Sequence, residues 1–463
     1  MRYIIQFLIL LFPTTSYLQP PHLTGKISIS IQNGSFDAEL VLSNIPRIED
    51  YYIWLNAGLN IKHFRNINDQ VNYGYKREFS SNSYEAFQYY FPASDQSQKF
   101  LPESFMIAYS GKFPVFNDTT RLSDWGDWKG NMAFNGNTFR ASEQSTFYPV
   151  LYDRKNDIIH NSYTYEISLE CADCTSLYIN GSAPVKASKA TLSSDFAVQL
   201  LIFAGDFDFK KILDTYLLNI DINHEKQMSL GDITRSITNF YAQKLGISYG
   251  SPVVYLSTRP VTKRNSWMFV TYPTIAYVGV PPYRLEDNFD PETHRFLIDQ
   301  RLKYIAHELG HYYFGTLFRA NSSLFWFFLE GITEYIALKA SEELAGNEVY
   351  HNIISEYVKD CRNAEFIPLH KIVTTNEIGD TYRYKLIPLM LICLEKEAGI
   401  ESMWQWLNFL LHDQNVTTQY NYFIESLIQS GISTSIVEEF AKKYIMDENF
   451  LDNIEKCIRA LIN

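Results

Sequence analysis

The sequence predicts an α+β protein with more than one domain, in which an antiparallel β sandwich precedes a mixed α/β lobe with helices towards the C-terminus. Two observations lead to this prediction. Apolar and polar residues alternate with period two through the first half of the chain, and apolar residues recur at helical spacing through most of the second half. A chain of 463 residues, 46% hydrophobic and 20% charged, is a folded globular protein.

The first half begins with a predicted hairpin. Residues 27–31 alternate, a tight turn follows at Asn33-Gly34, and residues 36–42 alternate again. Further short strands are expected at 165–169 and 177–179, separated from their neighbours by Asn, Gly, Ser and Asp. Short strands joined by such turns are typical of an antiparallel sandwich.

The pattern changes between Phe203 and Phe209, where we predict a domain boundary. A helix ending near Gly246 and strands at 253–256 and 268–272 are expected next. We therefore divide the chain into an N-terminal β domain, 17–205, and a second domain with C-terminal helices, 206–463. Helices are predicted in the second domain at 296–318, 324–340, 385–397 and 435–444.

Residues 1–16 resemble a signal peptide. A basic start at Arg2 precedes ten residues with one polar interruption, and small residues follow at Thr14, Thr15 and Ser16. We expect export to the periplasm or the extracellular space, with a buried N-terminal strand as the alternative. Later apolar clusters are interrupted by Glu or Pro, so no membrane span is predicted in the mature chain.

Charge and cysteine content exclude some function classes. The net charge of −12 has the wrong sign for binding nucleic acid or an anionic membrane surface. Cys171 and Cys174 are close enough in sequence to close a small disulfide loop, whereas a second CxxC for a four-thiolate zinc site is missing. A redox role is the alternative for this pair, but the flanking residues are predicted to be strands.

The strongest chemical signal is the sequence His307-Glu308-Leu309-Gly310-His311. Residues four apart share one face of a helix, so both imidazoles can reach one metal ion. Glu308, next to His307, is then placed to act on the water that this metal activates. The flanking residues contain no helix breaker except Gly315, which supports a helical motif.

A third zinc ligand is predicted at Glu330, after eighteen intervening residues. Glu330 follows four bulky apolar residues, and a carboxylate in such a segment is unfavourable unless it is paired or bound to metal. Glu334 lies one turn later on the same face, where it could accept the free ring N–H of a zinc-bound histidine. The alternative for Glu334 is a solvated carboxylate.

These motifs resemble the gluzincin metallopeptidases typified by alanyl aminopeptidase and leukotriene hydrolase, with glycyl aminopeptidases as near relatives. The resemblance rests on H-E-L-G-H, the eighteen-residue gap and L-E-G-I-T-E-Y, and extends weakly to segments 147–153, 178–181 and 203–207. It implies a saddle-like β domain followed by a thermolysin-like domain. It also implies an oxyanion-binding tyrosine, for which we choose Tyr384 over Tyr382, although the family's Tyr-x-Lys-Gly is not reproduced.

We predict a zinc-dependent peptidase with one Zn²⁺ per chain and peptide substrates. His307, His311 and Glu330 would hold the zinc, Glu308 would take the proton from the attacking water, and Tyr384 would stabilise the oxyanion. Two alternatives stay open, namely an inactive zincin used as a binding module and a zinc hydrolase of a non-peptide substrate such as an epoxide. Glu308 is not a metal ligand, so its presence favours an enzyme.

The resembled aminopeptidases hold the substrate's α-ammonium group with a glutamate on a strand before the zinc helix. The corresponding stretch here, residues 269–279, contains no carboxylate. An acidic anchor would have to come from elsewhere, such as the β domain, with Asp206 and Glu286 as distant candidates. We therefore expect relaxed exopeptidase character, with some cleavage of blocked peptides.

Overall fold

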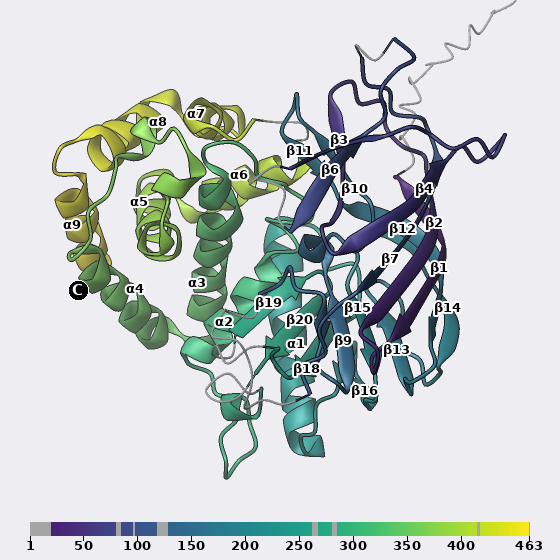
Figure 1. Cartoon of the computed structure of the whole chain (residues 1–463). Helices are drawn as coiled ribbons and strands as arrows, with labels where there is room; N and C mark the ends of the chain where they lie inside the picture. The colour runs from purple at the N-terminus through teal and green to yellow at the C-terminus, as the bar shows by residue number, and fades with distance from the viewer. Residues whose placement is uncertain are drawn as a thin grey trace, which may run out of the picture.

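The computed structural model describes residues 20–79, 85–95, 98–117, 128–261, 267–279, 285–413 and 417–462. The predicted signal peptide lies outside these residues. The strands of the N-terminal half lie on one side of the molecule and the helices of the C-terminal half on the other (Figure 1). The predicted α+β class, with a β-rich N-terminal domain and a helical C-terminal part, is confirmed. Within the described residues, no helix combines the length and apolar character needed to cross a membrane.

Three sheets make up the N-terminal domain, in the strand orders β14-β12-β1-β2-β7-β4, β11-β10-β3-β6-β5 and β13-β15-β9-β8. Their strands are β1 (His22–Ser30), β2 (Ser35–Ser43), β3 (Tyr51–Asn56), β4 (Leu59–Arg65), β5 (Lys76–Phe79), β6 (Ala86–Tyr90), β7 (Phe105–Lys112), β8 (Ala133–Phe134), β9 (Thr138–Ala141), β10 (Val150–Asp153), β11 (Ile158–His160), β12 (Ser162–Cys171), β13 (Ser176–Ile179), β14 (Lys189–Gln199) and β15 (Ile202–Gly205).

The predicted first hairpin is confirmed by β1 and β2, whose turn contains Gly34 at a φ of 63°. A Cβ atom there would lie 2.1 Å from the carbonyl oxygen of Phe113, so only glycine fits. The sandwich is not antiparallel throughout, because β1 pairs with β12 in parallel. Local alternation predicts which residues form strands but not which distant strand becomes the neighbour.

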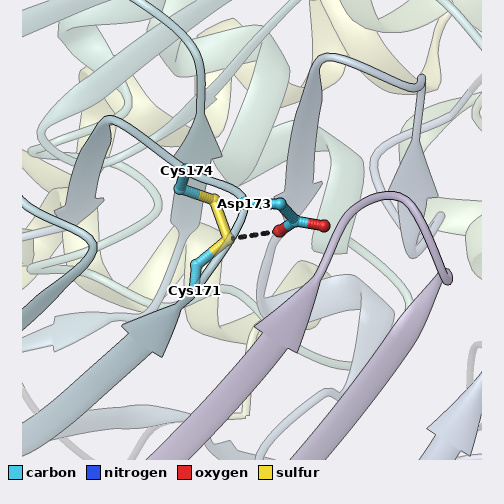
Figure 2. A group of neighbouring side chains, drawn as sticks. All are labelled: Cys171, Asp173 and Cys174. Atoms are coloured by element: carbon cyan, nitrogen blue, oxygen red, sulfur yellow. Dashed lines mark hydrogen bonds between the residues drawn. A yellow bond between two sulfur atoms is a disulfide. The ribbon is translucent and has the colours of Figure 1, made fainter.

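Cys171 and Cys174 form a disulfide at the turn between β12 and β13 (Figure 2). The carboxylate of Asp173, between them, accepts hydrogen bonds from the hydroxyl of Ser30 at 2.9 Å and from the backbone N–H of Ile31 at 3.0 Å. Asp173 therefore fastens this turn to the end of β1. Strands β12 and β13 flank the disulfide, as the sequence predicts.

The second domain begins with a five-stranded sheet in the order β16-β17-β18-β20-β19. Strands β17, β18 and β20 are parallel, and β19 closes one edge in the antiparallel direction. Helix α1 (His224–Leu245) connects β17 to β18 and ends at Gly246, as predicted, with a φ of 72°. The strands are β16 (Phe209–Ile212), β17 (Thr215–Leu218), β18 (Val253–Thr258), β19 (Trp267–Thr271) and β20 (Thr274–Val278).

Helices predominate in the rest of this domain where the structure describes it, and the prediction of one helix over 296–318 is wrong at both ends. Helix α2 covers only Gln300–Gly310 and begins after Asp299, whose carboxylate accepts a hydrogen bond from Arg301 N–H. After His311 the chain turns, and at Gly315 a Cβ atom would lie 2.8 Å from the carbonyl oxygen of His311. The later helices are α3 (Ile332–Ala345), α4 (Asn347–Cys361), α5 (Ile387–Ala398), α6 (Ile400–His412), α7 (Tyr420–Gln429), α8 (Thr434–Ala441) and α9 (Phe450–Ile462).

Two π-helical turns precede helices that the sequence predicts as uninterrupted. One covers Phe327–Gly331 and leads into α3, and the other covers Tyr382–Leu386 and leads into α5. The two turns are in contact, and a Cβ atom on Gly331 would lie 2.4 Å from the Ile387 side chain. A π turn shifts the side chains that follow it by one residue around the helix, and such turns often occur at functional sites.

Arg319 joins the two domains. It follows the turn after α2, and its half-buried side chain donates to the carbonyl of Ile159 at 3.1 Å and to the hydroxyl of Ser162 in the β domain. Desolvation lowers the pKa of this guanidinium, and a desolvated cation needs such acceptors. This contact fixes the segment that follows the zinc motif against β11 and β12.

Replacing Arg319 with Met should therefore lower the free energy of unfolding by about 2 to 4 kcal/mol, measured by urea denaturation. Arg459 is the matched control, because its side chain is 60% exposed and paired only with Glu455 among the described residues. Arg459→Met should change stability by less than about 1 kcal/mol. Equal losses in the two variants would contradict the role assigned to Arg319.

Candidate metal and catalytic site

Helix α2 presents the two histidines of the motif on one face. His307 is buried and His311, one turn later, is half-buried at the end of the helix. Between them Gly310 faces α3, where an added Cβ atom would lie 3.0 Å from the Thr333 side chain and 3.1 Å from that of Ile336. The glycine thus lets α2 approach α3 closely, and the histidine face meets the chain just before α3.

Glu330, in the π turn before α3, lies opposite both histidines. Its Oε2 is 3.1 Å from Nε2 of His307 and 3.4 Å from Nε2 of His311. The ligand atoms of these three residues all lie within 4.8 Å of one another. In a tetrahedral zinc site with bonds of about 2.0–2.1 Å, neighbouring donors are about 3.3 Å apart. The donor set therefore fits zinc in chemistry and in spacing.

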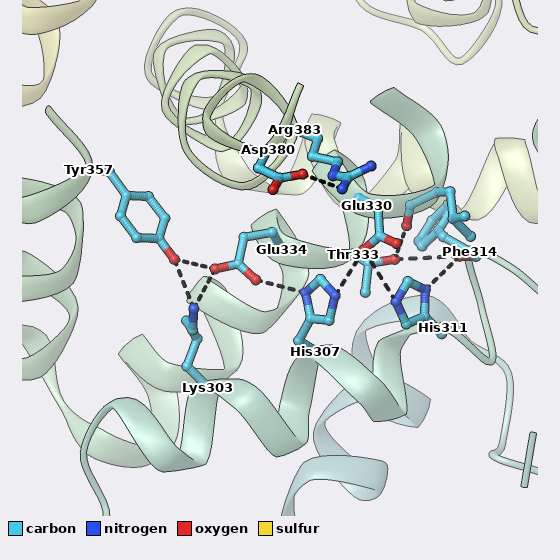
Figure 3. Close-up of polar contacts among 11 residues, drawn as sticks. Lys303, His307, His311, Phe314, Glu330, Thr333, Glu334, Tyr357, Asp380 and Arg383 are labelled. Atoms are coloured by element: carbon cyan, nitrogen blue, oxygen red, sulfur yellow. Dashed lines mark hydrogen bonds and ion pairs between the residues drawn. The ribbon is translucent and has the colours of Figure 1, made fainter. Parts of the chain in front are cut away.

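The second nitrogen of each imidazole has its own partner, which orients the ring (Figure 3). Nδ1 of His307 lies 2.7 Å from Oε2 of Glu334, and Nδ1 of His311 lies 3.4 Å from the carbonyl oxygen of Phe314. With the ring proton on Nδ1, each histidine turns the lone pair of Nε2 towards Glu330. A metal ion at this site would therefore meet Nε2 of both rings.

Glu334 is buried, with 1% of its surface exposed, so the solvated alternative does not describe its surroundings. Its Oε1 accepts a hydrogen bond from Nζ of Lys303 at 2.7 Å and another from the hydroxyl of Tyr357 on α4. The sequence prediction missed both residues. Lys303 lies four residues before His307 and therefore on the same face of α2, so its spacing could have predicted a contact near this histidine. Nothing in the sequence predicts the contact of Tyr357.

The carboxylates make the surroundings of His307 strongly favourable for a cation. Burial alone would lower its pKa, but hydrogen bonds and charge from Glu330 and Glu334 raise it to about 10. Burial opposes ionisation of Glu334, yet the charge of Lys303 and the hydrogen bond to His307 lower its pKa to about 2. Burial likewise opposes ionisation of Glu330, but charge and hydrogen bonds from His311 and His307 hold its pKa well below the usual range, so both glutamates stay ionised at neutral pH.

Glu308 is not one of the three candidate ligands, but it lies within the electric field of both histidines and of Glu330. Burial raises the pKa of this half-buried carboxyl, while the charges of His307 and His311 oppose the rise. Lys129, from the β domain, also opposes it, so the field of that lysine reaches the motif. A carboxylate with a raised pKa exchanges protons nearer neutral pH than an ordinary glutamate does.

Of the two tyrosines considered from sequence, Tyr384 lies at this site and Tyr382 does not. The ring of Tyr384 is 5.8 Å from that of His307, and burial together with the charges of Glu330 and Glu308 raises its pKa well above the ordinary value. Its hydroxyl therefore remains a proton donor. The hydroxyl of Tyr382 instead donates to the carbonyl of Ile367 at 2.9 Å.

Arg383, between these tyrosines, steadies the π turn. Its guanidinium carbon lies 4.4 Å from the ring centre of Trp326 and 5.1 Å from that of Tyr384, and it forms an ion pair with Asp380. A cation over aromatic rings is attracted by their electron-rich faces. Trp326 directly precedes the other π turn, so Arg383 links the segments that carry Glu330 and Tyr384.

Neither acidic residue proposed as an amine anchor is one of the three candidate zinc ligands. Asp206 is exposed at the end of β15, where it accepts a hydrogen bond from Thr175 at 2.8 Å. Glu286 lies on a short 3-10 turn, Leu285–Asn288, outside the ligand set. Glu143 of the β domain, which the sequence prediction missed, does contact the edge strand β19.

Comparison with solved structures identifies the fold. Native yeast LTA4 hydrolase superposes with a TM-score of 0.65 at 12% identity over 90% of this chain. This chain spans 66% of the length of that enzyme. An M1 zinc metallopeptidase from Deinococcus radiodurans superposes with a TM-score of 0.57 at 11% identity, covering 92% of this chain and 93% of its own. A variant of that metallopeptidase bound to a Tyr-Ser-Ala substrate gives the same TM-score, 0.57, at 12% identity, over 91% of this chain and 92% of its own.

At the level of sequence, no family profile and no curated protein matches the chain. The fold is thus the one that these zinc metallopeptidases and LTA4 hydrolase share. The low identity means that the likeness lies in the arrangement of the elements. Any assignment of chemistry to this chain rests on the side chains described above.

The contacts of Glu334 generate a prediction about metal affinity. Glu334→Ala should weaken zinc binding by roughly 10 to 100-fold without removing a ligand, because His307 loses the partner that holds its tautomer. Competition against a chelator measures this. Glu342→Ala is the control, since Glu342 lies two turns along the same helix and pairs with Lys339. Equal affinities for zinc in the two variants would contradict the role of Glu334.

Proposed function

We propose that this chain is a zinc-dependent peptidase that hydrolyses peptide bonds. The observation that carries the proposal is the convergence of His307, His311 and Glu330, with Glu308 and Tyr384 beside them. The fold shared with zinc metallopeptidases, one of them solved with a peptide substrate, supports it. A second candidate metal cluster within the described residues, Cys171, Asp173 and Cys174, has its sulfurs joined in a disulfide and therefore offers no thiolate.

In this proposal His307, His311 and Glu330 hold one zinc ion. When bound there, zinc supplies Lewis-acid polarisation of the scissile carbonyl and lowers the pKa of water towards about 7. Glu308 removes a proton from the attacking water and passes it to the departing amine. Tyr384 donates its hydroxyl proton in a hydrogen bond to the oxygen that becomes negative.

The remaining residues keep these groups in place. Glu334, fixed by Lys303 and Tyr357, orients His307. Strand β19 lies at the edge of its sheet and is in contact with α2, so an extended peptide could pair with the part of this strand that precedes Val270. Such pairing would bring a peptide bond along the edge towards the motif on α2.

The direct test is a Glu308→Gln variant. It should retain about one zinc per chain, because Glu308 is not among the ligands, and should lose hydrolysis, because an amide cannot accept the proton of water. Metal analysis and a turnover screen with peptides and lipid epoxides, with and without chelator, provide the readouts. A variant that lacks zinc, or one that retains full activity, would refute the role of Glu308.

The screen also separates the alternatives. Chelator-sensitive turnover of peptides by the wild-type protein supports the proposal. Turnover of epoxides alone would identify a hydrolase of a non-peptide substrate. Peptide binding without any turnover would identify an inactive binding module.

Tyr384→Phe should lower kcat/KM by about 100-fold or more, because the oxyanion loses one donor. Tyr382→Phe is the matched control. It loses the hydrogen bond to Ile367 and about 1 kcal/mol of stability, with kcat/KM changed by less than a few fold. If Tyr382→Phe caused the larger loss of kcat/KM, the choice of Tyr384 would be wrong.

A further inference from the structure

A buried ion pair from the β domain lies against the edge strand β19. Glu143, with 4% of its surface exposed, follows β9 and accepts a hydrogen bond from the hydroxyl of Thr271 at 2.9 Å. Its other carboxylate oxygen pairs with Nζ of Lys129. The same Nζ donates to the carbonyl oxygen of Val270 at 2.6 Å. Glu143 and Lys129 thus bind consecutive residues at the end of β19.

Lys129 already pairs with Glu143, so it takes the position that a substrate ammonium group would need beside this carboxylate. Both oxygens of Glu143 have partners, one of them the Lys129 cation, whose side chain is only 14% exposed. A second ammonium group at this point would meet a positive charge at close range and would have to displace a partly desolvated ion pair. Both effects disfavour a free amino terminus.

The Lys129 ammonium group can also donate a further hydrogen bond. An ammonium group has three N–H donors, and among the described residues Glu143 and the Val270 carbonyl take two of them. The third can bind a carbonyl oxygen. An acylated α-nitrogen brings such an oxygen and no charge, whereas a free α-amino group brings a charge and no such oxygen.

We propose that Lys129 acts as a built-in substitute for the substrate's ammonium group and selects peptides whose α-nitrogen is acylated. This inference rests on the proposed peptidase function. The ligand class is a peptide that carries an N-acyl carbonyl at this position, supplied either by a blocking group or by a preceding residue. Lys129 determines specificity, and Glu143 holds it in place.

The test compares one peptide in three forms, with a free amino group, with an N-acetyl group and with the amino group replaced by hydrogen. For the wild-type protein, kcat/KM should be highest for the acetyl form, by about tenfold or more over the free amine, with the hydrogen form between them. The hydrogen form separates rejection of charge from binding of the carbonyl.

One variant should invert the preference for the acetyl form, and a second should remove it. Lys129→Met leaves Glu143 without its cation, so the free amine should gain at least about tenfold relative to the acetyl form. Lys129→Met combined with Glu143→Gln should prefer neither form, and Lys129→Arg should keep the wild-type order. Zinc content and melting temperature identify any variant that fails to fold. The ratio of kcat/KM for the acetyl form to that for the free amine, measured on the wild-type protein, tests the proposal without any variant.

Binding to the Glu308→Gln protein gives a readout that does not require turnover. Affinity for the acetyl form should exceed that for the free amine in the same ratio as kcat/KM. If peptides bind in this order but are not cleaved by the wild type, the peptidase proposal fails and the role of Lys129 stands. A wild-type preference for the free amine in binding or turnover, an unchanged ratio in a folded Lys129→Met protein, or no peptide binding at all would overturn it.

Discussion

The packing of helix α2 against the segment that enters α3 is the contact on which this site depends. Gly310 lets the two elements approach, and Gly331 lets the same segment approach α5, so a side chain at either glycine would force them apart. Glu330 is carried by the π turn between these contacts and faces His307 and His311. Backbone packing over a few residues thus sets the spacing of all three donor atoms.

The burial of charged groups explains the contacts that surround the three candidate ligands. Glu334 and Lys303 are both desolvated, and each alone would be strongly unfavourable. Together with Tyr357 they form a hydrogen-bonded group in which Glu334 still has an oxygen for His307. The β domain uses the same principle at β19, where Glu143 and Lys129 are paired. In both places a buried carboxylate is held by a lysine, but only Glu334 also reaches a histidine.

The parts of the site that the sequence predicts are those set by local geometry. The spacing of His307 and His311 places them on one helical face, and Glu330 is conspicuous as a charge in an apolar segment. Lys129 and Glu143 could not be predicted as partners of β19, because residues more than a hundred positions apart meet only through tertiary packing. The parallel pairing of β1 with β12 escaped prediction for the same reason. The end of helix α2 at Gly310 depends on contacts of the turn that follows it, and these contacts cannot be predicted from the spacing of apolar residues.

X-ray absorption at the zinc edge of the purified wild-type protein tests the identity of the metal ligands most directly. Coordination by His307, His311 and Glu330 predicts only nitrogen and oxygen neighbours at about 2.0–2.1 Å, with the outer-shell pattern of imidazole rings. Sulfur neighbours at about 2.3 Å would contradict it, because they would place the metal at cysteine side chains instead.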